Sequence, residues 1–139
     1  MSYVGPFERA FMKHTLAILR RYRGEFDATL LLNCLLGLLI VPRESCLNSI
    51  PEDPVSELPK WGISPSSIEH FGNRENASTL RGLVHSLRNS VAHFRFEPIP
   101  KEGDVTAFRF HDANGFAATI DLKEMRDFVE RLSEHIHQS

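Results

Sequence analysis

Residues 80–95 read LRGLVHSLRNSVAHFR, and the prediction of the fold starts from this stretch. Plotted on an ideal helix, its apolar side chains gather on one side; they are Leu83, Val84, Leu87, Val91 and Phe94. A neighbouring stripe at heptad-like spacing is mostly basic; it holds Arg81, His85, Arg88, Ala92 and Arg95. The pattern predicts a helix over about 76–93, capped by Asn76 or Ser78, with one face in a core.

Arg88 and His93 are the candidate chemical groups of this helix. The forked, permanently charged guanidinium of an arginine suits phosphate, and a histidine exchanges protons near neutral pH. Such a pair would cleave RNA without a metal, one group holding the phosphate and the other moving the proton of the 2′-hydroxyl or of the leaving oxygen. Five positions apart, they lie roughly 140° round a helix. They therefore converge only if the helix ends or bends near His93, or if a second copy supplies its own pair.

A structural role for the same two residues stays open on spacing alone. An arginine and a histidine five positions apart recur by chance in helical proteins. A histidine near a helix C-terminus is favoured there because the helix dipole attracts a cation. The basic stripe would then be a solvated surface.

Composition indicates one soluble globular domain spanning residues 1–139, with 42% apolar and 24% charged residues. The net charge of -2 supplies no global field for nucleic acid, so any RNA contact needs a local basic patch. Two cysteines, Cys34 and Cys46, make no disulfide framework and fit a reducing cytosol. No signal peptide is recognisable, and the seven histidines show no metal-ligand spacing. We expect a cytoplasmic protein with no metal, no cofactor and no membrane contact.

Two further helices are predicted before this stretch, over residues 6–23 and 27–41. The first has an apolar stripe; it comprises Phe7, Phe11, Ile18 and Tyr22, widened by Thr15 and Leu19. The second is apolar almost all round but shorter than the roughly 20 residues that span a bilayer, which favours a central, buried helix. Gly37 within it would let a neighbouring helix approach closely.

The segments around the third helix have a different character. Residues 43–75 contain Pro51, Pro54, Pro59 and Pro65, which predicts a long ordered loop with at most short helical turns, pinned by Trp61. Residues 94–121 are predicted as a β-hairpin insertion, with strands over 105–111 and 116–121 joined at an Asn-Gly pair.

A last helix is predicted to begin at a capping box formed by Asp121 and Glu124. Its core stripe is apolar; it comprises Leu122, Met125, Val129, Leu132 and Ile136. The predicted fold is therefore mainly α: a bundle of four to five helices with a small β-hairpin inserted before the last helix.

The run Arg88-Asn89-Ser90-Val91-Ala92-His93 resembles the R-x4-6-H signature of HEPN domains, in which a polar residue such as Asn89 often follows the arginine. The late position of this motif on the third helix, the apolar second helix and the closing helix are also similar to that family. The resemblance covers about two thirds of the chain. The proline-rich loop and the hairpin depart from the simplest members.

This resemblance implies a HEPN-like bundle that forms a homodimer, with two motifs facing each other across the interface as one composite site. Many members are metal-independent endoribonucleases of toxin–antitoxin, CRISPR and phage-defence systems. Carried over, His93 is the general acid/base, Arg88 holds the phosphate, and Asn89 orients one of them. The same likeness makes an antitoxin protein a candidate partner.

Arg81, His85 and Arg95 are the candidate contacts to the RNA backbone. Other HEPN members are non-catalytic. The alternative function is therefore a HEPN-like binding module that regulates a partner protein or binds a nucleotide.

Overall fold

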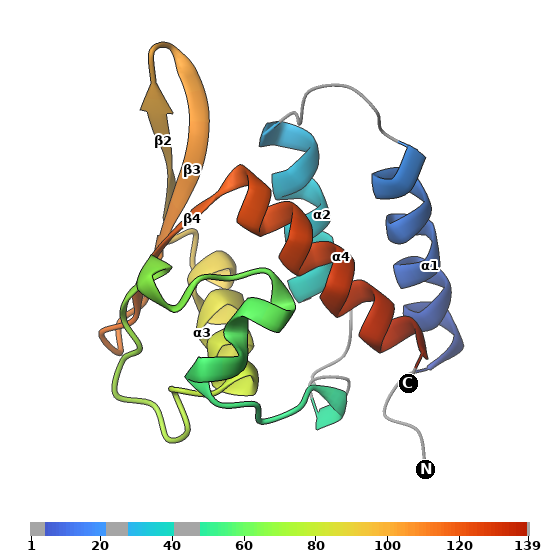
Figure 1. The fold of residues 1–139 in the computed structure, drawn as a ribbon, viewed down its shortest axis with the longest axis horizontal. Helices are drawn as coiled ribbons and strands as arrows, with labels where there is room; N and C mark the ends of the chain where they lie inside the picture. The colour runs from blue at the N-terminus through green and yellow to red at the C-terminus, as the bar shows by residue number, and fades with distance from the viewer. Residues whose placement is uncertain (1–4, 22–27, 41–47, 139) are drawn as a thin grey trace.

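A computed structural model describes residues 5–21, 28–40 and 48–138 of the chain. Its α-helices are α1 (Pro6–Arg21), α2 (Ala28–Ile40), α3 (Leu80–Ala92) and α4 (Leu122–Gln138). Its strands are β1 (Ile68–His70), β2 (Phe96–Lys101), β3 (Asp104–His111) and β4 (Ala117–Asp121). Two 3-10 helices, η2 (Val55–Trp61) and η3 (Pro65–Ser67), lie between α2 and β1 (Figure 1).

The predicted bundle with one small hairpin is wrong, because the strands form a four-stranded antiparallel sheet in the order β1-β4-β3-β2. The predicted hairpin is the pair β3–β4 at its centre, and a further strand flanks it on each side. β2 contains Pro98 and Pro100, which an interior strand would not accept, but an edge strand needs only one row of N–H groups. β1 comes from the segment predicted as loop and has three residues. The chain is therefore an α+β domain.

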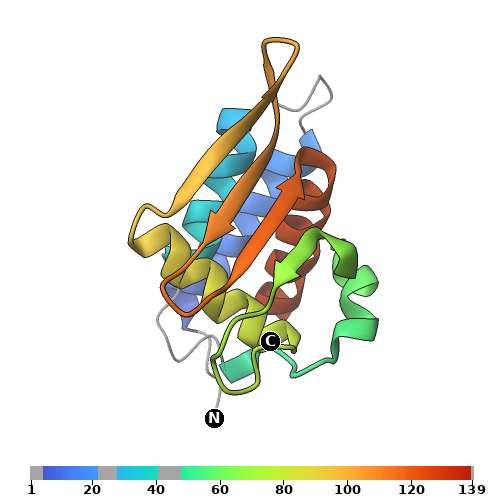
Figure 2. The same ribbon diagram turned by 90° about the vertical axis from the view of Figure 1, so that its left-hand side faces the viewer.

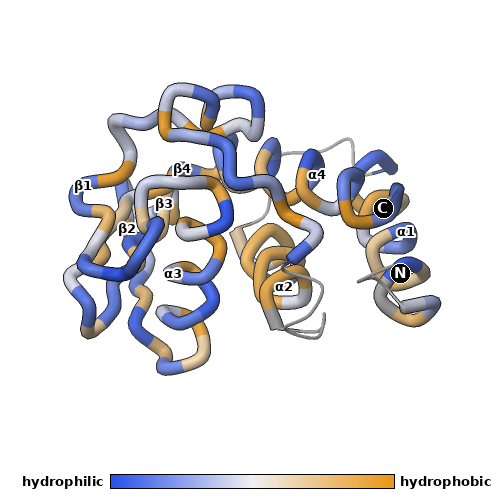
Figure 3. The backbone as a smooth tube through the Cα atoms, turned by 90° about the horizontal axis from the view of Figure 1, so that it is seen from below, coloured by the Kyte–Doolittle hydropathy of each residue, from blue (hydrophilic) through white to orange (hydrophobic). Residues whose placement is uncertain are grey.

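All four α-helices lie on one side of this sheet (Figures 1 and 2). α3 and α4 contact the sheet, α2 packs on both of them, and α1 packs on α4. Figure 3 shows α2, apolar along most of its length, between α3 and α1. The inner face of the sheet is apolar and buried; it carries Phe108, Phe110, Ala118 and Ile120. The α4 stripe predicted from periodicity faces this core, with Met125 and Val129 fully buried.

The first two helices confirm one expectation and correct another. A Cβ on Gly37 would come within 2.9 Å of the Phe11 ring, so the glycine does admit a neighbouring helix. The predicted core stripe of α1 is confirmed only in part: Thr15 and Leu19 are buried and Phe11 packs against the core, but Phe7 and Ile18 are 67% and 51% exposed. The buried side chains lie about a quarter turn further round α1; they are Met12, Thr15, Leu16 and Leu19. The apolar arc of α1 is wide, and packing on α4 selects one edge of it.

The 3-10 segment is ordered and anchored by Trp61, as predicted. The indole N–H donates to the Asp53 carboxylate at 3.0 Å, and the ring packs edge-on against His135 at 5.5 Å. Several predicted features lie outside the described residues: the helix boundaries at 23, 27 and 41, the start of the loop at 43–47, and Cys46. In the described helices, no segment has the length and apolar character needed to cross a membrane. Cys34 is half-buried, and burial raises the pKa of its thiol.

Candidate active site on helix α3

Helix α3 begins later than predicted, at Leu80, and Thr79 is its N-cap. The Thr79 hydroxyl accepts a hydrogen bond from the N–H of Gly82 at 3.1 Å, so neither Asn76 nor Ser78 caps the helix. Gly82 lies directly against the Asn76 carbonyl, with no room for a side chain. The tight turn before α3 therefore requires glycine at this position.

The two faces of α3 divide as the sequence pattern predicts. Leu83, Val84, Leu87 and Val91 are buried against the sheet and α2. The neighbouring stripe points outward: Arg81, His85 and Arg88 are half-buried and Ala92 is exposed. Phe94, expected in the core, is an exception, because its side chain is 85% exposed.

The helix ends at the motif histidine. His93 is the C-cap, and Phe94 follows with a left-handed φ of 55°. The N–H of Phe94 donates to the Val91 carbonyl at 3.1 Å, and the N–H of Arg95 donates to that of Ser90 at 2.8 Å. These two bonds are the pattern of a Schellman motif, which usually has glycine at the left-handed position. The left-handed turn carries the Phe94 ring out of the arc that a continued helix would have given it.

Ser90 adds a third bond to this turn and is fully buried. Its hydroxyl donates to the carbonyl of Arg95 at 2.7 Å, and the same carbonyl accepts the N–H of His111 on β3 at 3.0 Å. Ser90 therefore fixes the backbone that carries His93 and ties it to the sheet. The sequence reasoning missed this positioning residue; its signal was a serine at the edge of the apolar arc of a helix.

Arg88 and His93 both reach the surface, Arg88 half-buried and His93 exposed. Among the described residues, no side-chain hydrogen bond or ion pair engages either of them, and none joins the two. The helix does end at His93, which was one of the two conditions for convergence. Asn89 is half-buried and linked to His93 through the backbone, since its carbonyl accepts the His93 N–H at 3.2 Å.

Arg81, predicted to contact RNA, is engaged within the chain. Its Nε donates to the Ile50 carbonyl at 2.8 Å and its Nη2 to that of Asn48 at 3.2 Å. Its Nη1 lies 3.4 Å from Glu52. The guanidinium thus holds the segment before η2 against α3, although 31% of the side chain remains exposed.

His85 lies before Arg88 on α3, and Arg95 lies after it, in the turn beyond the end of the helix. His85 borders a hollow of about 330 Å³, together with Arg74 and Arg81 and the carboxylates of Glu52 and Glu75. Arg95 is half-buried, and its backbone is part of the turn that closes the helix. The N-terminal end of the outward stripe therefore has both acidic and basic side chains near it. Its C-terminal end, around Arg88 and His93, is basic.

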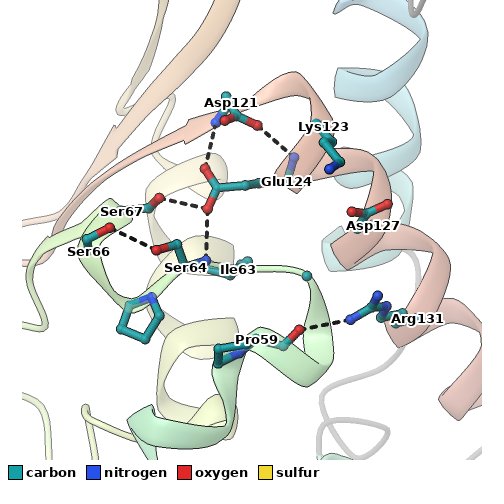
Figure 4. A pocket seen from close by; sticks show the side chains of 12 residues that line it. Pro59, Ile63, Ser64, Ser66, Ser67, Asp121, Lys123, Glu124, Asp127 and Arg131 are labelled. Atoms are coloured by element: carbon teal, nitrogen blue, oxygen red, sulfur yellow. Dashed lines mark hydrogen bonds between the residues drawn. The ribbon is translucent and has the colours of Figure 1, made fainter.

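A second and larger hollow, of about 630 Å³, lies away from the motif at the start of α4 (Figure 4). Glu124 is at its centre and accepts the N–H of Ser64 at 2.9 Å and the hydroxyl of Ser67 at 2.7 Å. Glu124 also closes the predicted capping box with Asp121, at 3.3 and 2.7 Å. This network joins η3 to α4.

Arg131 completes the wall of this hollow. It donates to the carbonyls of Pro59 and Lys60 at 2.9 and 2.6 Å, which holds the end of η2 on α4. Glu124 and Arg131 are therefore both engaged with other parts of the chain. In the described ranges, no three His, Cys, Asp or Glu side chains gather as a metal-binding group.

Comparison with known proteins gives one match. The family model described as HEPN pEK499 p136 covers residues 1–139, so the chain belongs to this HEPN family. No curated protein and no solved structure matches the chain. The resemblance seen in residues 88–93 is thereby confirmed at the level of the family.

Proposed function

We propose that the protein is a metal-independent endoribonuclease of the HEPN type, acting as a homodimer. The observation that carries the proposal is that Arg88 and His93, the two signature positions of a HEPN domain, are accessible on α3 and unengaged by other described residues. A structural arginine resembles Arg81, whose guanidinium is bound to neighbouring carbonyls. The Arg88 guanidinium, in contrast, makes no hydrogen bond to other described residues.

The dimer is proposed because five helical positions place Arg88 and His93 roughly 140° apart, so that a second copy would bring the two groups together. The outward stripe of α3 has exposed Ala92 between Arg88 and His93, and a small side chain lets a second helix approach closely. If two copies of α3 faced each other, Arg88 of one copy would lie near His93 of the other. The homodimer, the RNA substrate and an antitoxin partner all belong to this proposal.

The proposed reaction uses the two side chains in separate roles. His93 takes the proton of the 2′-hydroxyl while the 2′-oxygen attacks phosphorus, and the bond to the 5′-oxygen breaks. The protonated imidazole of either copy returns a proton to the leaving 5′-oxygen. Arg88 neutralises the non-bridging oxygens with its fork. The products are a 2′,3′-cyclic phosphate and a 5′-hydroxyl.

A net charge of -2 favours a structured or delivered RNA over sequence-independent binding to long strands, since that binding depends on neutralising many phosphates. Ser90 holds the backbone of the turn that carries His93, the proposed acid/base.

The test is cleavage of mixed cellular RNA by the full chain in EDTA, with product ends analysed for the cyclic phosphate. We expect His93→Ala to lower the cleavage rate about 10²–10⁴-fold, the usual contribution of a positioned acid/base, while its melting temperature stays unchanged. Exposed His14 on α1 supplies the matched control, His14→Ala, which should cleave normally. Full activity of His93→Ala, or a monomer that cleaves at the wild-type rate, would rule the proposal out.

A further inference from the structure

Phe94 is the most exposed large apolar side chain among the described residues, at 85%. It directly follows His93 and has a left-handed φ of 55°. Glycine would take this backbone conformation without strain, whereas a side chain with a Cβ does not. Neither the turn nor the core therefore requires phenylalanine at this position, and its ring is free to bind.

The ring is the outer end of an aromatic stack that starts in the core. Phe94 and Phe96 have ring centroids 6.4 Å apart with 26° between planes, and Phe96 and Phe110 are 6.1 Å apart at 30°. Phe110 is fully buried on β3, and Phe96 lies opposite it on the edge strand β2. The buried ring thus supports the half-buried one, which supports Phe94. An additional flat ring at the solvent end would extend this stack.

Basic residues adjoin Phe94 in the sequence. His93 precedes it, half-buried Arg95 follows it, and Arg88 lies on the outward stripe of α3, the helix that ends just before it. An aromatic face flanked by cations is the combination with which proteins hold unpaired nucleotides, the base on the ring and the phosphates on the charges.

We infer that Phe94 is a stacking platform for a nucleobase beside the scissile phosphate, and that the substrate is therefore RNA with an unpaired base at the cleavage site. The inference rests on the proposed function. A base inside a duplex is stacked on its neighbours and unavailable to such a ring, so loops and single strands are favoured.

The experiment uses the full chain with His93→Ala, to prevent cleavage, and a short single-stranded RNA containing 2-aminopurine, whose fluorescence falls on stacking. Phe94→Gly and Phe94→Leu should abolish the quenching and weaken binding roughly 5- to 150-fold, whereas Phe94→Trp should preserve both. Phe94→Gly removes the strained side chain, so its melting temperature should not fall. Phe7→Ala, which removes an exposed phenylalanine on α1, is the control and should bind normally.

Two results would overturn the inference. One is unchanged RNA affinity and quenching in Phe94→Gly. The other is a Phe94→Gly variant that loses dimer in sedimentation but binds RNA normally, since the ring would then contact a second copy.

The inference and the nuclease proposal can also fail separately. Wild-type protein that does not cleave RNA, combined with Phe94-dependent quenching, refutes the nuclease and supports the platform. Cleavage that is equally efficient in wild-type protein and in Phe94→Gly supports the nuclease and refutes the platform. An absence of both RNA binding and cleavage refutes both hypotheses.

Discussion

The hollow at the start of α4 and the outward stripe of α3 differ in how their polar groups are used. The hollow has a volume of about 630 Å³, and Glu124 and the Nη1 of Arg131 are engaged by bonds to η2 and η3. At the C-terminal end of α3, by contrast, the side chains of Arg88 and His93 make no hydrogen bond or ion pair with other described residues. Polar groups that satisfy each other stabilise a fold, whereas an exposed cation without a partner is available to a ligand. Available charge, and not volume, is therefore the ground on which we propose the site at Arg88 and His93.

The largest effect expected from this comparison is on Arg88. Arg88→Ala should lower RNA cleavage about 10²–10³-fold, as for other losses of a group that stabilises developing charge, and Arg88→Lys should restore little because the fork is lost. Cleavage rates and urea unfolding would both be measured. Lys123→Ala, which removes a cation from the lining of the α4 hollow, should leave both unchanged. An equal loss of RNA cleavage in Lys123→Ala would contradict the proposal that the active site lies on α3 and not in the α4 hollow.

An intermediate effect is expected for Glu124, and on stability alone. Glu124→Ala removes the acceptor for Ser64, Ser67 and the Asp121 N–H, which should lower the free energy of unfolding by about 1–2 kcal/mol. RNA cleavage by the folded protein should remain at the wild-type rate. Lost cleavage with unchanged stability would instead place the chemistry in the hollow.

The smallest effect, on the free energy of unfolding, is expected for Glu69 on the outer face of the sheet. Its carboxylate accepts hydrogen bonds from Thr119 and Arg109 but is exposed to solvent. The Thr119 hydroxyl first, and then Arg109, lower the pKa of the Glu69 carboxyl from its ordinary value near 4.5. The folded state therefore favours the charged form, and its stabilisation is complete above the unfolded pKa and lost as pH falls through the lower folded pKa.

We expect Glu69→Gln to cost about 0.2–1 kcal/mol at neutral pH, as for exposed ion pairs. Unfolding of both proteins in urea across pH should show that this difference shrinks below about pH 4.5. A difference that grows on acidification would contradict the sign of the pKa shift. A large difference at neutral pH would show that exposed networks stabilise this fold as much as the partly buried one around Glu124.

Local patterns predicted the elements whose partners are close in sequence. The capping box of Asp121 and Glu124, the α4 stripe and the β3–β4 hairpin are all as expected. The hairpin turn forms at the Asn-Gly pair, but it is not the type I′ turn, left-handed at both residues, that this pair favours. The Asp112 carboxylate accepts the N–H of Asn114 and only Gly115 is left-handed.

The missed features depend on distant contacts. Pro98 and Pro100 argue against a strand until β3 is known to lie on one side of β2 only. The turn at Glu102 and Gly103, left-handed at both residues, was missed because glutamate rarely takes that conformation. Phe94 left the predicted core because the Schellman turn, fixed by Ser90 and β3, ends the helix before it.

By itself, the sequence determined the amphipathic faces of α3 and α4, the family and the presence of an arginine and a histidine on one helix. These properties follow from residue types at short spacings, which the geometry of a helix converts directly into faces. Only the tertiary structure decided that Arg81 is bound while Arg88 is not, and that a stack of rings reaches the surface at Phe94. Those facts depend on which distant carbonyls and rings the fold brings to each side chain, and no local spacing encodes that.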